Sequence, residues 1–308
     1  MRVLFRHVRR GGEDLHADAT CGHNVIATVY VQARSMYRQD GPEELRSLGE
    51  TEYINGAAAM SASGAFGKPL LCAGIVGFID LTLGDRVPEI AARHQAAAGE
   101  RFKGIRHTTA YDDHPDVRGS TTVSPKGLMA SKEFRRGFAH LAKLGLSYDS
   151  WLYHTQIKEL ADLARAFPET TIIMDHCGGP LGIGPYAGRR DEIFKTWEAD
   201  IRDIAKCPNV NVKLGGLGMK INGFGFETDD LPPTSEKVAA AFKPYIETCI
   251  RYFGPERAMF ESNFPVDKGS YSYAVNWNAF KRLAAGASAD EKAKLFKDTA
   301  ARVYRLNV

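Results

Sequence analysis

Short β-branched apolar runs alternate with longer amphipathic stretches along most of the chain, and this alternation restricts the fold more than any other feature. Seven runs have the length and composition of buried strands: residues 24–31, 70–80, 102–108, 146–154, 170–177, 209–214 and 257–262. Apolar residues recur at helical spacings between and after them, in residues 87–98, 132–144, 156–166, 191–206, 235–253 and 288–304. A strand followed by a helix, repeated in this way, predicts parallel βαβ units.

Loop lengths help to choose between a closed barrel and an open, doubly wound sheet. The connections from helix to strand are short and contain Gly or Pro, as at Gly145 and at residues 254–255. The connections from strand to helix are long: residues 32–50, 110–131, 178–190, 215–234 and 263–272. Long loops usually carry function, and these would gather at the carboxyl ends of the strands. Both folds bind ligands there, but so many contributing loops favour a TIM-type (β/α)8 barrel.

Composition excludes several classes of protein. A chain of 308 residues fits one barrel domain. Its 40 Lys and Arg against 37 Asp and Glu leave a formal charge of +3, so nucleic acid is not an expected partner. The longest apolar run, residues 70–83, is short for a membrane span and contains Asp80. No secretory signal is recognisable, and five widely spaced cysteines suit reduced thiols, so we expect a cytoplasmic protein without membrane contact.

Two histidines stand where predicted strands end. His154 closes the run of residues 146–154, and His176 closes the next strand, just before a Gly-rich loop. Strand alternation places His176 on the face opposite Asp175. A single histidine in such a place is as often a neutral structural residue as a functional one. Two of them on consecutive strands favour a functional site, with His176 and His154 as candidate catalytic residues.

Other polar residues near strand ends extend this candidate site. Arg106 lies near the end of a third predicted strand. Its guanidinium can bind a substrate carboxylate through two N–H groups, but a salt bridge at the rim of the barrel would explain an arginine there equally well. His107 and Tyr153 are further candidates for substrate contact. Lys213 and Glu261 are also near strand ends, and we rank them below the histidines.

The last predicted strand ends at Asn263, which we include among the candidate catalytic residues. Asp267, four residues farther on, could reach inward to a substrate. A catalytic zinc site usually has three protein ligands and an open position, so His154 and His176 are one ligand short. Asn263 is a poor substitute for a carboxylate, and a metal site is weakly supported by these residues.

Four motifs together resemble the amidohydrolase-related family, a TIM-barrel branch with dicarboxylate lactonases and related decarboxylases. They are GHNV at residues 22–25, GIRH at 104–107, DHCGGP at 175–180 and FESNFP at 260–265. The resemblance implies a distorted barrel with a polar or metal cluster at the strand carboxyl ends. By position it implies a strand-five role for His154, a strand-six role for His176 and a substrate contact for Arg106. It leaves open whether one divalent metal such as zinc is bound, with His154 and His176 as ligands, or none.

The sequence departs from this family in two places. The family's first strand normally ends in an H-x-H pair, which is absent here, and Asn263 stands where a strand-eight Asp is expected. We therefore expect an atypical segment at residues 1–22 and the barrel domain at 23–308, with the first βα unit missing or altered. A barrel short of one unit would expose strand edges, which a homo-oligomer could cover.

These observations predict a hydrolase that acts on a small, carboxylated and therefore anionic lactone-like or amide-like substrate. His176 and His154 would serve as base or electrophilic groups, and Arg106 would hold the carboxylate. Two alternatives remain open on the same barrel. One is a non-oxidative decarboxylase that needs a bound divalent metal, and the other is a catalytically impaired barrel that only binds a ligand or partner.

Overall fold

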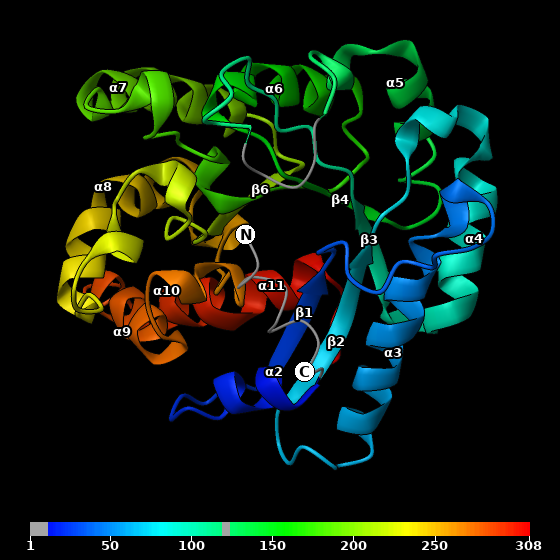
Figure 1. Ribbon diagram of the computed structural model, residues 1–308, viewed down its shortest axis with the longest axis horizontal. Helices are drawn as coiled ribbons and strands as arrows, with labels where there is room; N and C mark the ends of the chain where they lie inside the picture. The colour runs from blue at the N-terminus through cyan, green and yellow to red at the C-terminus, as the bar shows by residue number, and fades with distance from the viewer. Residues whose placement is uncertain (1–11, 119–123) are drawn as a thin grey trace.

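Seven parallel strands form one curled sheet in the computed structural model, which describes residues 12–118 and 124–308 (Figure 1). The strands are β1 (Ala27–Val31), β2 (Leu70–Gly77), β3 (Phe102–Arg106), β4 (Ser147–Ser150), β5 (Ile172–Met174), β6 (Val210–Leu214) and β7 (Ala258–Phe260). They follow one another in sequence order, and each pairs in parallel with the next. Each of the predicted runs contains one of these strands, so the predicted parallel βαβ architecture is confirmed.

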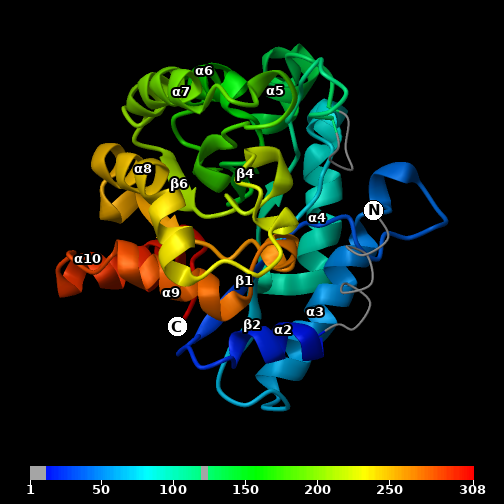
Figure 2. The ribbon, with the colours of Figure 1, turned by 60° about the vertical axis from the view of Figure 1, so that its left-hand side comes forward.

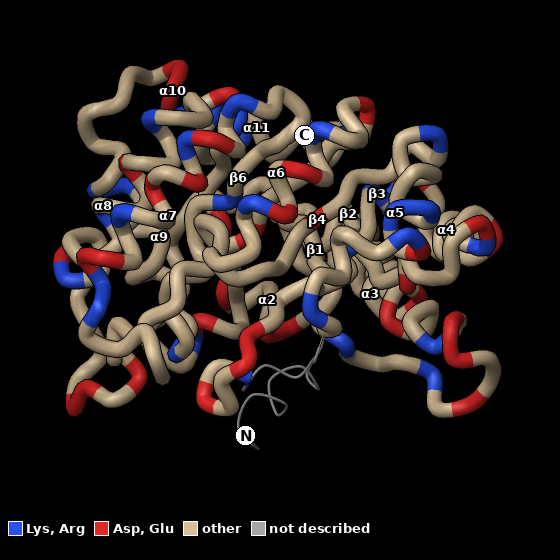
Figure 3. The backbone as a smooth tube through the Cα atoms, turned by 90° about the horizontal axis from the view of Figure 1, so that it is seen from above, with Lys and Arg blue, Asp and Glu red and all other residues tan. Residues whose placement is uncertain are grey.

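Helices surround the outer side of the sheet (Figures 1 and 2). They are α2 (Gly12–Ala19), α3 (Leu48–Ala62), α4 (Val87–Ala98), α5 (Lys132–Phe138), α6 (Ile157–Ala166), α7 (Arg190–Ile204), α8 (Ser235–Phe253), α9 (Tyr273–Leu283), α10 (Ala289–Ala293) and α11 (Thr299–Val303). The predicted helix over 288–304 is divided, because a π-helical segment at Lys294–Asp298 separates α10 from α11. Basic and acidic residues are interspersed over the helices and loops (Figure 3), in keeping with the small net charge.

The sheet remains open between its first and last strands. Within residues 12–118 and 124–308, β1 pairs only with β2 and β7 pairs only with β6. All five residues of β1 are half-buried, whereas β6 is buried throughout. On the outside, α2 contacts both α9 and β2, so the helix layer continues where the strand layer is interrupted (Figure 2). The sheet is therefore a TIM-type barrel sheet with seven strands. This agrees with the prediction of a barrel whose first βα unit is missing or altered.

Apolar side chains from non-adjacent strands meet inside the curl. Val76 of β2, Ile173 of β5 and Met259 of β7 are buried in one cluster, together with Val303 and Tyr304 from the end of the chain. Because strands that are not neighbours can share contacts only across the interior, these residues mark the lumen. The polar residues at the carboxyl ends of the strands therefore stand on a packed apolar base.

No helix among the residues that the structure describes is long and apolar enough to cross a membrane.

The lumen cluster predicts a large effect of a single truncation. Ile173→Ala removes a fully buried side chain and should lower the free energy of unfolding by about 2–5 kcal/mol, because the rigid strands cannot close the cavity. Ile26→Ala, the same substitution at a residue with 38% exposure, is the matched control and should cost less than about 1 kcal/mol. Denaturant titration of both variants measures the difference. Equal losses would contradict this description of the interior.

Candidate functional site

Four charged side chains meet at the carboxyl end of the sheet, and we call them the Lys213 cluster: Lys213, Asp149, Asp175 and Glu261. Lys213 lies on β6 and Asp149 on β4, while Asp175 and Glu261 directly follow β5 and β7. The Lys213 Nζ is 2.6 Å from Asp149 Oδ1, 2.8 Å from Asp175 Oδ1 and 3.9 Å from Glu261 Oε2. Their exposure is low, between 0% for the two Asp side chains and 14% for Glu261. One ammonium group therefore faces carboxylates from three other strands.

Lys213 and Asp175 favour each other's ionised state in this cluster. Burial alone would lower the pKa of Lys213, but the carboxylates of Asp149 and Asp175 outweigh it and raise this pKa well above its ordinary value. Burial would raise the pKa of Asp175, but the Lys213, His176 and Arg106 cations lower it to about 2. For Asp149, burial outweighs the attraction of Lys213 and its pKa is raised. Removing the ammonium would leave buried carboxylates without their cation, which proteins tolerate poorly.

His176 and Glu261 form a hydrogen-bonded pair beside this cluster. The His176 Nδ1 is 2.5 Å from Glu261 Oε1, and the backbone N–H of His176 donates to the same oxygen over 3.1 Å. The Trp151 ring meets the imidazole edge to face at a centroid distance of 4.8 Å. Burial would lower the pKa of His176, but the negative charges of Glu261 and Asp175 reverse the direction and raise it. A carboxylate that accepts from Nδ1 fixes the ring and leaves Nε2 to interact with another molecule.

Two glycines after β6 make room for this pair. An ideal Cβ on Gly216 would lie 2.2 Å from His176 Nδ1, and one on Gly215 would lie 2.6 Å from Glu261 Cγ. His176 itself has a left-handed backbone with φ of 55°. A non-glycine residue seldom adopts this conformation, and such residues concentrate at functional sites. The Gly-Gly pair was a signal for the site that our sequence reasoning did not use.

Arg106 lies at the same end of the sheet, at the end of β3. Its Nη1 is 3.4 Å from Asp175 Oδ2, its Nε donates to Gln32 Oε1 over 3.3 Å, and its Nη2 donates to the Gln32 carbonyl. The Arg106 side chain retains 16% exposure. The structure thus joins Arg106 to the Lys213 cluster through Asp175.

Asn263 and Asp267 form a second polar group after β7. Asp267 Oδ1 accepts from Asn263 Nδ2 over 2.7 Å, and Asp267 Oδ2 accepts from the Tyr271 hydroxyl over 2.7 Å and from the Gly218 N–H over 3.2 Å. Burial raises the pKa of Asp267 to about 6, although these donors and the His176 charge act in the opposite direction. Asp267 is therefore buried and holds Asn263 in place, while its contact with a substrate stays a prediction.

The other predicted residues pack in the surrounding loops. His154 Nδ1 accepts from the Leu181 N–H over 3.3 Å, and burial lowers the pKa of His154 to about 4. His107 Nδ1 accepts from the Leu81 N–H over 3.1 Å, and burial lowers its pKa to about 4 as well.

Tyr153, the third of these residues, is buried and donates from its hydroxyl to the Val117 carbonyl over 3.3 Å. Within the described part of the chain, no hydrogen bond or ring contact joins His154 to His176.

The described residues do not fit a three-ligand metal site. Among residues 12–118 and 124–308, no group of three His, Cys, Asp or Glu side chains could hold a metal ion. The contacts explain this result: His176 Nδ1 faces Glu261, and Asp149 and Asp175 face Lys213. A catalytic zinc normally needs three protein ligands in one place.

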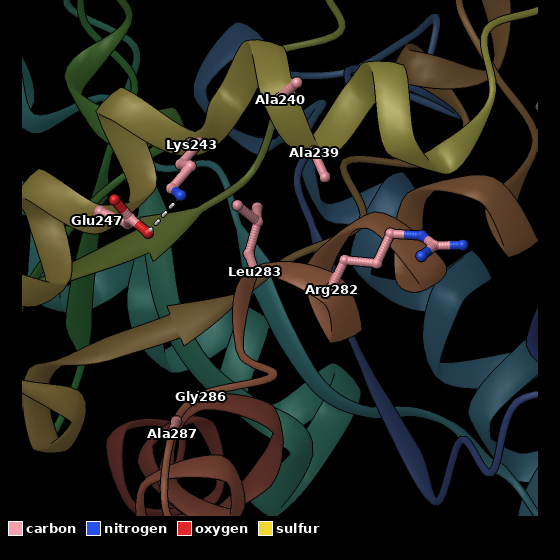
Figure 4. Close-up of a pocket in the computed structure, with 8 residues that line it drawn as sticks. All are labelled: Ala239, Ala240, Lys243, Glu247, Arg282, Leu283, Gly286 and Ala287. Carbon is pink, nitrogen blue, oxygen red and sulfur yellow. Dashed lines mark ion pairs between the residues drawn. The ribbon is translucent and has the colours of Figure 1, made fainter.

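A hollow of about 470 Å³ between α8 and α9 is separate from these strand ends (Figure 4). It is lined by Ala239, Ala240, Lys243, Glu247, Arg282, Leu283, Gly286 and Ala287. None of the predicted site residues borders it.

The fold and the polar strand ends define a TIM-barrel protein with its candidate site at the carboxyl end of the sheet. A sequence model of amidohydrolases matches residues 15–306, and the chain therefore belongs to the amidohydrolase family. This confirms the family resemblance predicted from the motifs.

Individual relatives agree with this assignment. An uncharacterized protein y4mH of Sinorhizobium fredii is 36% identical over 294 residues, which cover 96% of this chain and 85% of that protein. An L-fucono-1,5-lactonase of Burkholderia multivorans is 28% identical, with 86% of each chain covered. A crystal structure of a B. multivorans amidohydrolase with bound zinc has a TM-score of 0.65 at 26% identity, covering 83% of this chain and 79% of that one. A manganese-bound 5-carboxyvanillate decarboxylase of Novosphingobium aromaticivorans shares the fold, with a TM-score of 0.58 at 14% identity and coverage of 96% and 79%.

The close approach of Gly216 to His176 predicts a specific loss of stability. Gly216→Ala should lower the free energy of unfolding by more than about 2 kcal/mol. The new Cβ would clash with the His176 imidazole, and an alanine is also strained in the left-handed backbone conformation of Gly216. Gly188→Ala is the matched control, since Gly188 has φ of 74° and open space around its Cβ position. It should lose only about 1 kcal/mol. Denaturant titration compares the two, and equal losses would show that His176 does not occupy this place.

The raised pKa of Asp267 predicts a pH-dependent stability. The folded carboxyl keeps its proton up to about pH 6, whereas an unfolded Asp loses it near pH 3.8, so folding is progressively disfavoured as the pH rises between these values. The wild type should therefore lose on the order of 2–3 kcal/mol of unfolding free energy relative to Asp267→Asn between pH 4 and pH 6. Denaturant titrations across this range measure the difference, with Asp116→Asn at an exposed position as control. A difference that does not change with pH would contradict the environment described for Asp267.

Proposed function

We propose that this protein is a hydrolase that opens a small lactone bearing a carboxylate, with the His176–Glu261 pair as its acid–base group. The observation that carries the proposal is the 2.5 Å contact between His176 Nδ1 and Glu261 Oε1 at the carboxyl end of the barrel sheet. Active sites of TIM barrels lie at this end. Membership of the amidohydrolase family and the similarity to L-fucono-1,5-lactonases support the choice of reaction.

The chemistry assigned to each residue follows from its contacts. In the neutral state of His176, Glu261 accepts a hydrogen bond from Nδ1–H, and Nε2 is then free to take a proton from water as the water oxygen attacks the lactone carbonyl. The tetrahedral intermediate then collapses, the ring C–O bond breaks, and His176 returns the proton to the departing ring oxygen. The product is the open hydroxy acid. Asn263, held through one N–H by Asp267, has a second N–H that can donate to the oxyanion.

Arg106 supplies the selectivity for an anionic substrate in this proposal. Its guanidinium is held by Asp175 and Gln32 and is still partly exposed, so one edge of the fork can bind a carboxylate. His107, Tyr153 and His154 then have supporting roles, because Tyr153 and His154 are buried and His107 is only 12% exposed.

A divalent metal has no assigned step in this reaction. Relatives contain zinc or manganese, but the described residues of this chain do not form a three-ligand site. The alternative of a metal-dependent decarboxylase is tested by elemental analysis of the purified protein. A stoichiometric metal together with loss of CO2 from an aromatic or aliphatic acid would favour it over the lactonase.

His176→Ala should abolish most of the lactonase activity. We expect kcat to fall by about 10²–10⁴-fold on a panel of carboxylated lactones, because the base is removed. His140→Ala is the matched control, since His140 Nε2 lies 3.1 Å from Asp85 at the surface and forms the same kind of pair outside the barrel. It should turn over at the wild-type rate. Unchanged turnover by His176→Ala would remove His176 from the mechanism.

A further inference from the structure

Glu261 presents its two carboxylate oxygens to two different cationic groups. Oε1 lies 2.5 Å from His176 Nδ1, and Oε2 lies 3.9 Å from Lys213 Nζ. The Glu261 carboxylate, which orients the His176 imidazole through Oε1, is therefore attracted to the Lys213 ammonium through Oε2. A carboxylate between two such groups has little freedom to rotate.

Asp175 has the same arrangement toward Arg106. Its Oδ1 accepts from Lys213 Nζ over 2.8 Å, and its Oδ2 lies 3.4 Å from Arg106 Nη1. Asp175 is completely buried, so no solvent competes for these contacts. Arg106 and His176 therefore each depend on a carboxylate whose other oxygen faces the same lysine.

We propose that Lys213 is a positioning residue. By holding Asp175 and Glu261, it fixes the position of the Arg106 guanidinium and of the His176–Glu261 pair. This inference rests on the proposed function, because it assigns the roles of Arg106 and His176 from it. Without the ammonium, Asp149, Asp175 and Glu261 would be close carboxylates with no shared cation, and they would repel one another. Asp175 would then draw Arg106 away from substrate, and Glu261 would release His176.

The third contact of Lys213, with Asp149, connects it to a residue outside the site and provides a control. Asp149 Oδ1 accepts from Lys213 Nζ over 2.6 Å and from the Tyr304 hydroxyl over 2.6 Å. Tyr304 belongs to the lumen cluster, on the apolar base of the sheet. Tyr304→Phe removes one buried hydrogen bond from the cluster but leaves the contacts of Lys213 with Asp175 and Glu261.

The test uses Lys213→Met, Lys213→Arg and Tyr304→Phe with two measurements. The first is the far-downfield proton NMR signal of the His176 Nδ1–H bonded to Glu261, assigned by its loss in His176→Asn. The second is the KM for a carboxylated lactone compared with that for its methyl ester. We expect Lys213→Met to lose the signal, to raise the KM of the acid by about 10- to 100-fold with little change for the ester, and to lower kcat for both.

The controls separate positioning from a general structural role. Lys213→Arg keeps the charge and should retain the NMR signal, and Tyr304→Phe should resemble the wild type in both measurements. If Lys213→Met does not fold, the double variant Asp149→Asn/Lys213→Met, which leaves one fewer unpaired carboxylate, is measured in the same way.

The outcomes distinguish failure of this inference from failure of the proposed function. An NMR signal and an acid-to-ester KM ratio that both survive in Lys213→Met would overturn the positioning role, as would absence of the signal from the wild type. If the wild type opens no lactone, the proposed function fails, but the NMR signal still decides whether Lys213 holds the pair, because it requires no turnover.

Discussion

The buried ammonium group of Lys213 determines how the carboxyl end of this barrel sheet is organised. A lysine with 5% exposure needs compensating charge, and the structure supplies it from β4 and from the residues after β5 and β7. These carboxylates lie on or directly after different strands, so the ion pairs also connect strands that are not neighbours in the sheet, such as β4 and β6. Replacing such a network by apolar residues often leaves stability unchanged, which is consistent with the positioning role that we propose for Lys213.

The same interactions set the chemical character of the groups around them. Burial moves the pKa of His154 and of His107 down to about 4, because it outweighs the opposing negative charge of Asp112 near His154 and of Asp80 near His107. His176 is equally enclosed, yet its pKa is raised, because Glu261 and Asp175 surround it with negative charge. The sequence predicted both histidines at strand ends, but β4 ends at Ser150, four residues before His154, whereas His176 lies two residues after β5. These two histidines thus acquire opposite properties. Of the two, His176 has a carboxylate bonded to its ring, which suits the acid–base role proposed for it.

Much of the fold could be predicted from the sequence, because strand and helix periodicities and loop lengths are local signals. Each predicted strand run contains an observed strand, and the seven-stranded sheet agrees with the expectation of a missing or altered unit. The site was harder to predict, since sequence position indicated that His154 and His176 end neighbouring strands but not what each would contact. Nothing in the sequence placed Glu261 and Lys213 above the histidines, because the contacts of Glu261 with His176 and of Lys213 with Asp149 join strands that are not neighbours in the sheet. Gly215 and Gly216 were the local sign of that crowding.

The central claim is that Glu261 holds His176 ready for proton transfer, and Glu261→Gln tests it most directly. This substitution keeps the shape of the side chain but replaces the charged acceptor, so the imidazole loses its fixed tautomer. Turnover of a carboxylated lactone should fall by about 10²-fold or more while the variant remains folded, and Glu44→Gln at the exposed Arg86 pair should have no effect. A folded Glu261→Gln protein with wild-type turnover would contradict the account.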